Sequence, residues 1–305
     1  MLNRLFFGRA DRPDAAPLVR PKTRPELFRQ SLRVRFLSMF GPNLIVALFF
    51  LPALVWTEMT LQITSGVSAD PAATLSSQLV GTYLVGLFLC ITITGPAMAG
   101  LSLLMRNWAR GENCYRIATL FGGMKRNWKQ GMLAAARSGL TPLLFYSTFN
   151  YYGAMSETAS LLYLLPLALC GLLCIFLLLM QQTVYTLLVT YALPFRKVLK
   201  NAFLLVFLEL PRSLLTLVVS LLPLLAACGL LLLLPLHTGL IVVLICAYYA
   251  LIGLSLERFV AASFANFACE KHLNSRLPGA RVDIGLKSER TVGGDEPSDA
   301  GAPVQ

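Results

Sequence analysis

One stretch of the sequence decides how the chain is folded: residues 94–131 have the sequence TGPAMAGLSLLMRNWARGENCYRIATLFGGMKRNWKQG. The stretch begins in an apolar run, continues through a basic segment and returns to an apolar run near Met132. This order is typical of two membrane-spanning helices that are joined on the cytosolic side of a bilayer. The segment therefore indicates where the membrane lies and which side of it is cytosolic.

The composition supports the same class. Of the 305 residues, 56% are hydrophobic and 13% are charged, whereas a soluble domain carries about 25% charged residues. Several apolar runs approach the roughly 20 residues that a helix needs to cross a bilayer. We therefore predict an all-α polytopic membrane protein.

The apolar runs predict six transmembrane helices inside a domain that covers residues 27–272. The basic segment 1–26 before it and the polar segment 273–305 after it are predicted to be disordered cytosolic tails. The first apolar run could instead be the core of a cleaved signal peptide, but it exceeds the roughly 7–15 residues of such a core. The predicted spans are about 42–63, 78–105, 131–152, 159–191, 211–234 and 240–262.

The positive charges predict the topology. All 26 Lys and Arg residues fall within residues 1–35, 106–137, 196–212 and 258–305, and the three alternate connections contain none. Positive charge concentrates on the cytoplasmic side of membrane proteins. We therefore expect a multi-pass protein of the bacterial plasma membrane with both termini in the cytoplasm. This distribution also accounts for the net charge of +11, so we expect the anionic inner leaflet, and no nucleic acid, as its partner.

Basic amphipathic segments precede the first, third and fifth predicted spans, and the chain is predicted to form three helical hairpins, each preceded by an elbow helix. The elbows could anchor the protein at the interface or bind a membrane or cytosolic protein partner, and the two roles are compatible. The adjacent glycines Gly122 and Gly123 are predicted to interrupt the second elbow and to let it swing. The predicted docking surface comprises Arg116, Lys125, Arg126, Trp128, Lys129, Arg196, Lys197 and Lys200.

Small residues at the end of the second span predict a close helix contact. Glycine and alanine allow a neighbouring backbone to approach closely, and a proline can kink a helix. The alternative is a broken helix that lines a substrate path. The segment consists of Gly95, Pro96, Ala97, Ala99 and Gly100, together with Met98.

The same motifs carry a resemblance to a known family. The GPAMAG stretch at 95–100 is followed by Arg106, Arg110, Gly111 and Glu112, and then by Asn127, Lys129 and Gln130 before the third span. Over about residues 28–265 the chain resembles the YesL-like family of predicted bacterial integral membrane proteins. The long basic N-terminal tail and the polar C-terminal tail depart from the family pattern. The resemblance implies an accessory or regulatory membrane component associated with carbohydrate uptake, and it defines no catalytic residues.

The sequence contains none of the HExxH, GxSxG or P-loop motifs that accompany common catalytic sites. Glu58 and Glu157 are predicted near the outer ends of the spans, and Glu209 and Glu257 near the inner surface. We therefore expect no enzyme, no cofactor and no metal site. A small-solute transporter or permease subunit remains the alternative function.

Overall fold

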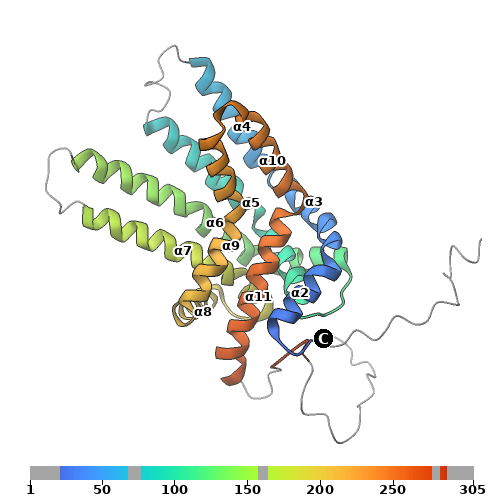
Figure 1. Ribbon diagram of the computed structural model, residues 1–305. Helices are drawn as coiled ribbons and strands as arrows, with labels where there is room; N and C mark the ends of the chain where they lie inside the picture. The colour runs from blue at the N-terminus through green and yellow to red at the C-terminus, as the bar shows by residue number, and fades with distance from the viewer. Residues whose placement is uncertain (1–20, 68–76, 157–163, 277–281, 287–305) are drawn as a thin grey trace, which may run out of the picture.

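The computed structural model describes residues 21–67, 77–156, 164–276 and 282–286, and within these ranges the regular structure is entirely helical (Figure 1). Short 3-10 turns at Leu37–Met39, Pro235–His237 and Asn274–Arg276 and a π-helical segment at Tyr249–Gly253 interrupt or flank the α-helices. The α-helices are α2 (Arg24–Arg35), α3 (Phe40–Leu48), α4 (Leu51–Val67), α5 (Ser77–Ala109), α6 (Arg116–Ser156), α7 (Leu164–Thr190), α8 (Phe195–Leu208), α9 (Leu210–Leu233), α10 (Thr238–Tyr248) and α11 (Leu254–His272).

Four helical stretches are long and apolar enough to cross a membrane, namely 78–109, 164–190, 210–233 and 238–272. A fifth candidate is the pair formed by residues 37–48 and 51–63, whose two parts are bent by 55°. The second half of α6 covers the predicted third span, but it contains Arg137 among several Ser, Thr and Asn residues and does not meet the same criterion. The structure thus supports a membrane protein with four or five candidate spans.

The first apolar run is bent, whereas its sequence predicts one continuous span. Pro52 lies in the first turn of α4, and a proline has no N–H group to donate to the residue one turn earlier. The helix therefore stops at Leu48 and starts again at Leu51. The preceding amphipathic helix, α2, ends at Arg35, and Gly41 and Pro42 lie in the first turn of α3.

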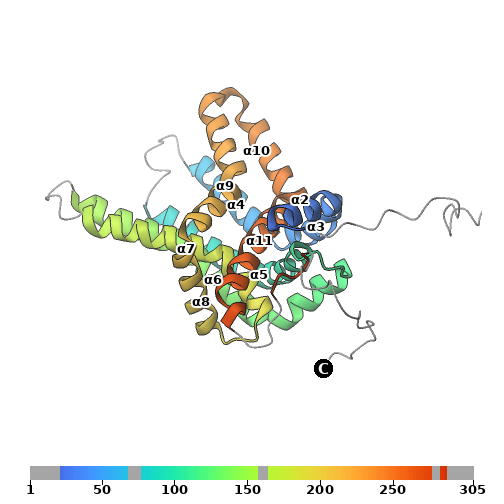
Figure 2. The same ribbon diagram turned by 60° about the horizontal axis from the view of Figure 1, so that its bottom comes forward.

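Three pairs of neighbouring helices diverge from a common base. Helices α6 and α7 project together to one side, and α9 and α10 project in another direction, in both views (Figures 1 and 2). Helices α4 and α5 form the third pair. The base contains α2, α8 and α11, the helices that carry or adjoin the basic segments.

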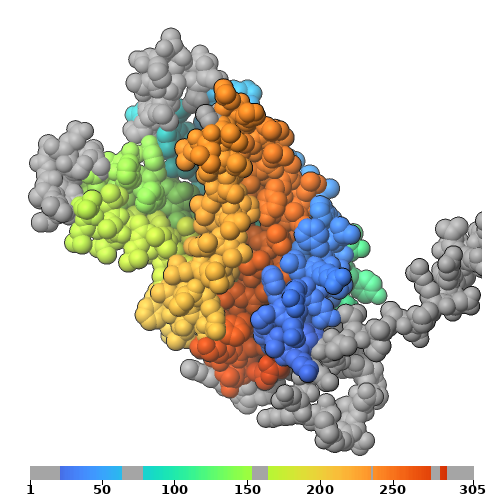
Figure 3. Space-filling model, viewed as in Figure 1, coloured from blue at the N-terminus to red at the C-terminus, as the bar shows by residue number. Residues whose placement is uncertain are grey.

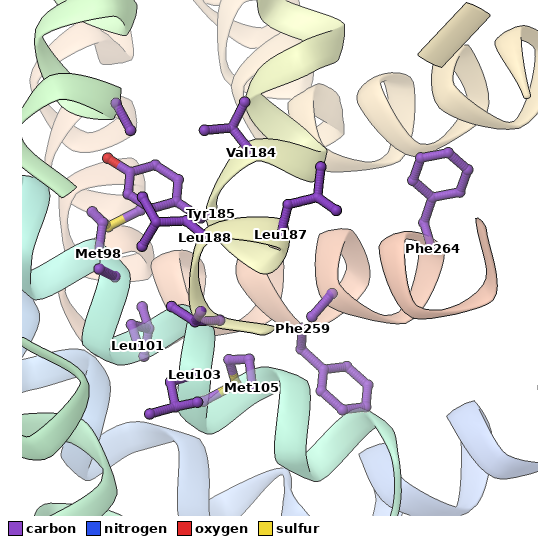
Figure 4. Close-up of a cluster of buried hydrophobic side chains, with 14 of the residues drawn as sticks. Met98, Leu101, Leu103, Met105, Val184, Tyr185, Leu187, Leu188, Phe259 and Phe264 are labelled. Carbon is purple, nitrogen blue, oxygen red and sulfur yellow. The ribbon is translucent and has the colours of Figure 1, made fainter. Parts of the chain in front are cut away.

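The hydrophobic core lies in this base rather than along the full length of the helices. Figure 4 shows its centre, where Met98 and Leu101 of α5 approach Tyr185 and Leu188 of α7, with Phe259 of α11 beside them. All five side chains are buried. Many leucines in the outward halves of α4, α7, α9 and α10 are exposed, as expected for helix surfaces that contact lipid.

The N-terminal helix α2 lies against α11 on the face seen in Figure 3. The rings of Phe28 and Phe259 pack there with their centroids 5.3 Å apart. The start of α2 is capped by Glu26, whose carboxylate accepts a hydrogen bond from the Thr23 N–H at 3.3 Å. Helix α2 is therefore part of the base, where it packs against α11, the last long helix of the chain.

Candidate functional site

The predicted small-residue segment lies where α5 crosses α6. A Cβ atom added to Gly95 would lie 2.3 Å from the carbonyl oxygen of Gly131, and one added to Gly100 would lie 2.4 Å from the carbonyl oxygen of Leu120. A Cβ atom at Gly123 would lie 2.9 Å from the Gly100 Cα atom. The two backbones are thus in direct contact at two levels, which only glycine permits at these positions.

The remaining members of the segment are arranged around this crossing. Ala97 and Ala99 are fully buried, and α5 continues as one helix through Pro96. The structure therefore does not support the alternative interpretation, in which the chain is broken at this point to line a substrate path.

The second elbow is interrupted four residues later than predicted. Helix α6 runs through Gly122 and Gly123, and its only non-helical backbone angles within the described span are at Asn127, with φ −115° and ψ 18°. Gly123 is buried against α5 rather than acting as a hinge. The expectation that the glycine pair breaks the helix is therefore wrong. Gly123 packs closely against α5 and Gly122 faces away from it, and both lie within the continuous helix.

The residues of the predicted docking surface are exposed in both helices that carry them. Trp128 is 49% exposed, and the Lys129 ammonium lies 5.4 Å from the centroid of its ring. The Gln130 side chain donates a hydrogen bond of 3.1 Å to the carbonyl oxygen of Leu193, just before α8. This contact brings the end of one basic segment beside the start of the other. The exposed basic and aromatic residues are Arg116, Lys125, Arg126, Trp128 and Lys129 in α6 and Arg196, Lys197 and Lys200 in α8.

A second polar site lies between α6, α7 and α11, and we call it the interior arginine cluster: Arg137, Gln181, Tyr185, Glu257 and Arg258. The Arg137 guanidinium donates to the Gln181 side-chain oxygen. Arg258 is 4% exposed and donates to Glu257 Oε1 at 2.6 Å and to the Gln181 carbonyl oxygen at 3.4 Å. Its guanidinium carbon lies 5.6 Å from the centroid of the Tyr185 ring. The cluster connects three helices through two cations and one carboxylate.

The sequence alone does not predict that these residues lie close together. By its position in the chain, Arg137 belongs to the basic segment that sets orientation, and Glu257 is expected near the inner surface of the membrane. The structure does pair Glu257 with Arg258, but it places Arg258 in the interior. The available signal is the recurrence of polar residues inside apolar runs on three helices, which does not by itself show that they face one another.

A third polar site joins the α8–α9 junction to the end of α11. The buried carboxylate of Glu209 accepts hydrogen bonds from Arg212 at 2.6 Å and from Lys271, and its Oε1 atom lies 2.8 Å from His272 Nε2. Burial raises the pKa of Glu209, but the hydrogen bonds from Lys271, His272 and Arg212 outweigh it and lower the pKa to about 2. This carboxylate is therefore a charged structural anchor at neutral pH.

Residues 282–286 of the predicted disordered C-terminal tail have a defined place in the base. The N–H of Asp283 donates to Glu270 at 3.2 Å, and Arg24 pairs with Glu270 while donating to the carbonyl oxygen of Ile284 at 3.4 Å. Gly285 has a φ of +86° and lies directly against the Arg110 carbonyl group. Ile284, Gly285 and Leu286 line one side of a cavity of about 480 Å³ between α2 and the turn that follows α5.

A buried asparagine satisfies the backbone at the π-helical segment. Asn43 of α3 is fully buried and donates to the carbonyl oxygens of Tyr249 and Ala250 at 2.8 and 2.7 Å. Its side-chain oxygen accepts from the Ser255 N–H at 2.7 Å. A π-helical insertion disturbs the regular hydrogen-bond ladder, and Asn43 supplies partners at that point.

Among the described residues, no group of three or more His, Cys, Asp or Glu side chains is arranged to hold a metal ion. Comparison with known proteins gives no match to a family model, to a curated protein or to a solved structure. The resemblance to the YesL-like family therefore rests on the sequence motifs alone.

Proposed function

We propose that the chain is a multi-pass protein of the bacterial plasma membrane with six transmembrane segments in three hairpins and with both termini in the cytoplasm. The separation of Lys and Arg from the three alternate connections supports this topology. The third of these segments would be the second half of α6, where Arg137 is accommodated by polar contacts to α7.

The function that these features support best is that of a non-enzymatic accessory or regulatory component. The observation that carries this proposal is the exposed basic surface of α6 and α8, which includes Trp128 as a large exposed aromatic residue. Aromatic and arginine side chains are the residues that most often dominate binding energy at protein interfaces. A role in carbohydrate uptake follows from the YesL-like resemblance alone.

The partner can be sought by photocrosslinking in cells. A photoreactive residue at Arg116 or Lys197 should give a discrete crosslinked product, since both positions are exposed. The fourfold variant R116Q/K125Q/R126Q/K129Q, probed from position 197, should insert normally, because Arg106 and Arg110 remain to set orientation. It should lose the product.

The matched control for this experiment changes no docking residue. Replacing Arg29 and Arg33 of α2 by Gln removes exposed positive charge from a different helix of the base. The control should keep the crosslinked product. If the product also survives the fourfold change, the basic surface is only an interfacial anchor and the accessory proposal loses its structural support.

A small-solute transporter or permease subunit is the second candidate, and the interior arginine cluster is the observation that favours it. Charged residues within membrane helices commonly mark paths for ions and solutes. Purified protein in proteoliposomes should then move a solute, and E257Q should reduce that flux. Stable partner crosslinking together with an absence of flux for a panel of sugars and organic anions supports the accessory function.

A further inference from the structure

The interior arginine cluster contains two positively charged side chains but only one carboxylate. Arg258 pairs with Glu257 at 2.6 Å. Within the part of the chain that the structure describes, the ion pairs do not include Arg137, whose guanidinium donates to the Gln181 side chain and to the Leu177 carbonyl oxygen. The cluster thus contains two guanidinium groups and one carboxylate, and the carboxylate pairs with Arg258 alone.

Two buried guanidinium nitrogens at this site have no hydrogen-bond partner among the described residues. They are Nε of Arg137 and Nε of Arg258. A buried donor that lacks an acceptor loses its hydration without compensation, and an unneutralised buried charge costs still more. The arrangement is that of a site which an anionic group would complete.

The cluster is accessible from the side of the helix bundle. Arg137 is only half-buried, and its neighbours one turn away on α6, Leu133 and Leu140, are exposed, as is Leu178 on α7. In a membrane this apolar surface faces lipid. Trp128, a residue type that prefers the interface, lies 9 residues earlier in the same helix. The half-buried side chain of Arg137 is therefore placed in the half of the bilayer that is nearer the base.

We propose that the interior arginine cluster binds a phosphate-bearing anion, with Arg137 as its principal ligand and Arg258 supplying the second positive charge. A guanidinium group presents paired donors that match phosphate oxygens, and basic pockets between membrane helices near the cytoplasmic surface are suited to anionic lipid headgroups. The phosphate can come from an inner-leaflet phospholipid or from a free anion. This proposal goes beyond the accessory function, because it concerns a different surface and a different ligand.

The test is thermal unfolding and native mass spectrometry of the detergent-purified full chain with three probes. The probes are phosphatidylglycerol, the zwitterionic lipid phosphatidylcholine, and inorganic phosphate against chloride at equal ionic strength. Retention of phosphatidylglycerol over phosphatidylcholine identifies a lipid headgroup as the source. Stabilisation by inorganic phosphate identifies a free anion.

Two variants give opposite expectations. R137Q should weaken binding of the effective probe by about tenfold or more, since it removes a charge-assisted hydrogen-bond donor. E257Q should strengthen binding, because it removes the carboxylate that competes for Arg258. The matched control R29Q changes an exposed arginine of α2 that lies outside both the cluster and the docking surface, and it should bind like the wild type. If R137Q does not fold, the proposal is still tested by E257Q, for which it predicts stronger binding.

The proposal is overturned if wild type, R137Q and E257Q retain the same amount of each probe, or if R29Q loses as much as R137Q. The first result would make the cluster an internal polar contact only. The second would make any lipid binding a general effect of surface charge. Loss of partner crosslinking leaves the phosphate site unaffected, so the two proposals fail separately.

Discussion

Replacing Gly95 with alanine should force α5 away from α6. The added Cβ atom would lie 2.3 Å from the carbonyl oxygen and 2.5 Å from the carbonyl carbon of Gly131, and 2.7 Å from the Met132 Cα atom. All three atoms belong to the backbone, so a side-chain rotation cannot relieve the contact. Since non-bonded carbon atoms prefer separations of about 3.5–4.0 Å, the helices must move apart by about 1 Å.

The size of the effect follows from comparison with a glycine whose added Cβ would meet open space. A Cβ atom added to Gly122 in α6 would have no atom within 4 Å apart from the adjacent turns of its own helix, so Gly122→Ala should stabilise the helix by about 0.5–1 kcal/mol. Gly95→Ala gains the same helix propensity but adds an overpacking cost of about 1–3 kcal/mol. The difference between the two variants isolates the cost of the close contact.

The measurement is thermal unfolding of both variants and the wild type in the same detergent. We expect Gly95→Ala to unfold several degrees below Gly122→Ala, and Gly95→Leu to reduce the folded yield further. Equal unfolding temperatures for the two alanine variants would show that α5 and α6 are not in backbone contact at this level. The close crossing of α5 and α6 described above would then be refuted.

Three other properties can be tested. Because Glu209 has a pKa of about 2 in the folded protein against an ordinary value of 4.5, its contribution to stability is complete above about pH 4.5 and is lost as the pH falls toward 2; the unfolding temperature of Glu209→Gln should lack that decline, and an unchanged pH profile would contradict the role of the carboxylate. Asn43→Ala removes three hydrogen bonds at the π-helical segment and should destabilise the protein by about 2–4 kcal/mol, so wild-type denaturation would refute its structural importance. In intact cells, an impermeant thiol reagent should label Thr238→Cys but not Ser275→Cys, and the reverse pattern would invert the proposed topology.

The membrane class and the helical fold could be predicted because they depend on composition and on the length of apolar runs. Which helices face one another could not, since a uniformly apolar helix carries little pattern to distinguish a lipid-facing side from a protein-facing side. The close crossing at Gly95 could be anticipated because small residues have few other uses inside a span. The interruption at Asn127 could not, because the adjacent glycines gave a stronger local signal for a break.

Contacts within the polar sites could be predicted only where the residues are close in sequence. Arg258 and Glu257 are adjacent in sequence, so their pairing could be expected from sequence alone. Arg137 and Gln181 lie on different helices, and only the packing of α6 against α7 brings them together. The role of Asn43 could not be predicted from the sequence either, because its hydrogen-bond partners belong to a π-helical segment more than 200 residues away.

The distribution of contacts indicates how a bilayer would complete this fold. Lipid provides no hydrophobic driving force between apolar helices, so polar contacts and close packing must hold them together. In this chain both are concentrated at the base, where Glu209 ties the start of α9 to the end of α11 and Asn43 ties α3 to the π-helical segment. The outward halves have exposed leucines, such as Leu232 and Leu233 at the end of α9. Substitutions in the base should therefore disturb all three helix pairs together, whereas apolar exchanges near the outward ends should be tolerated.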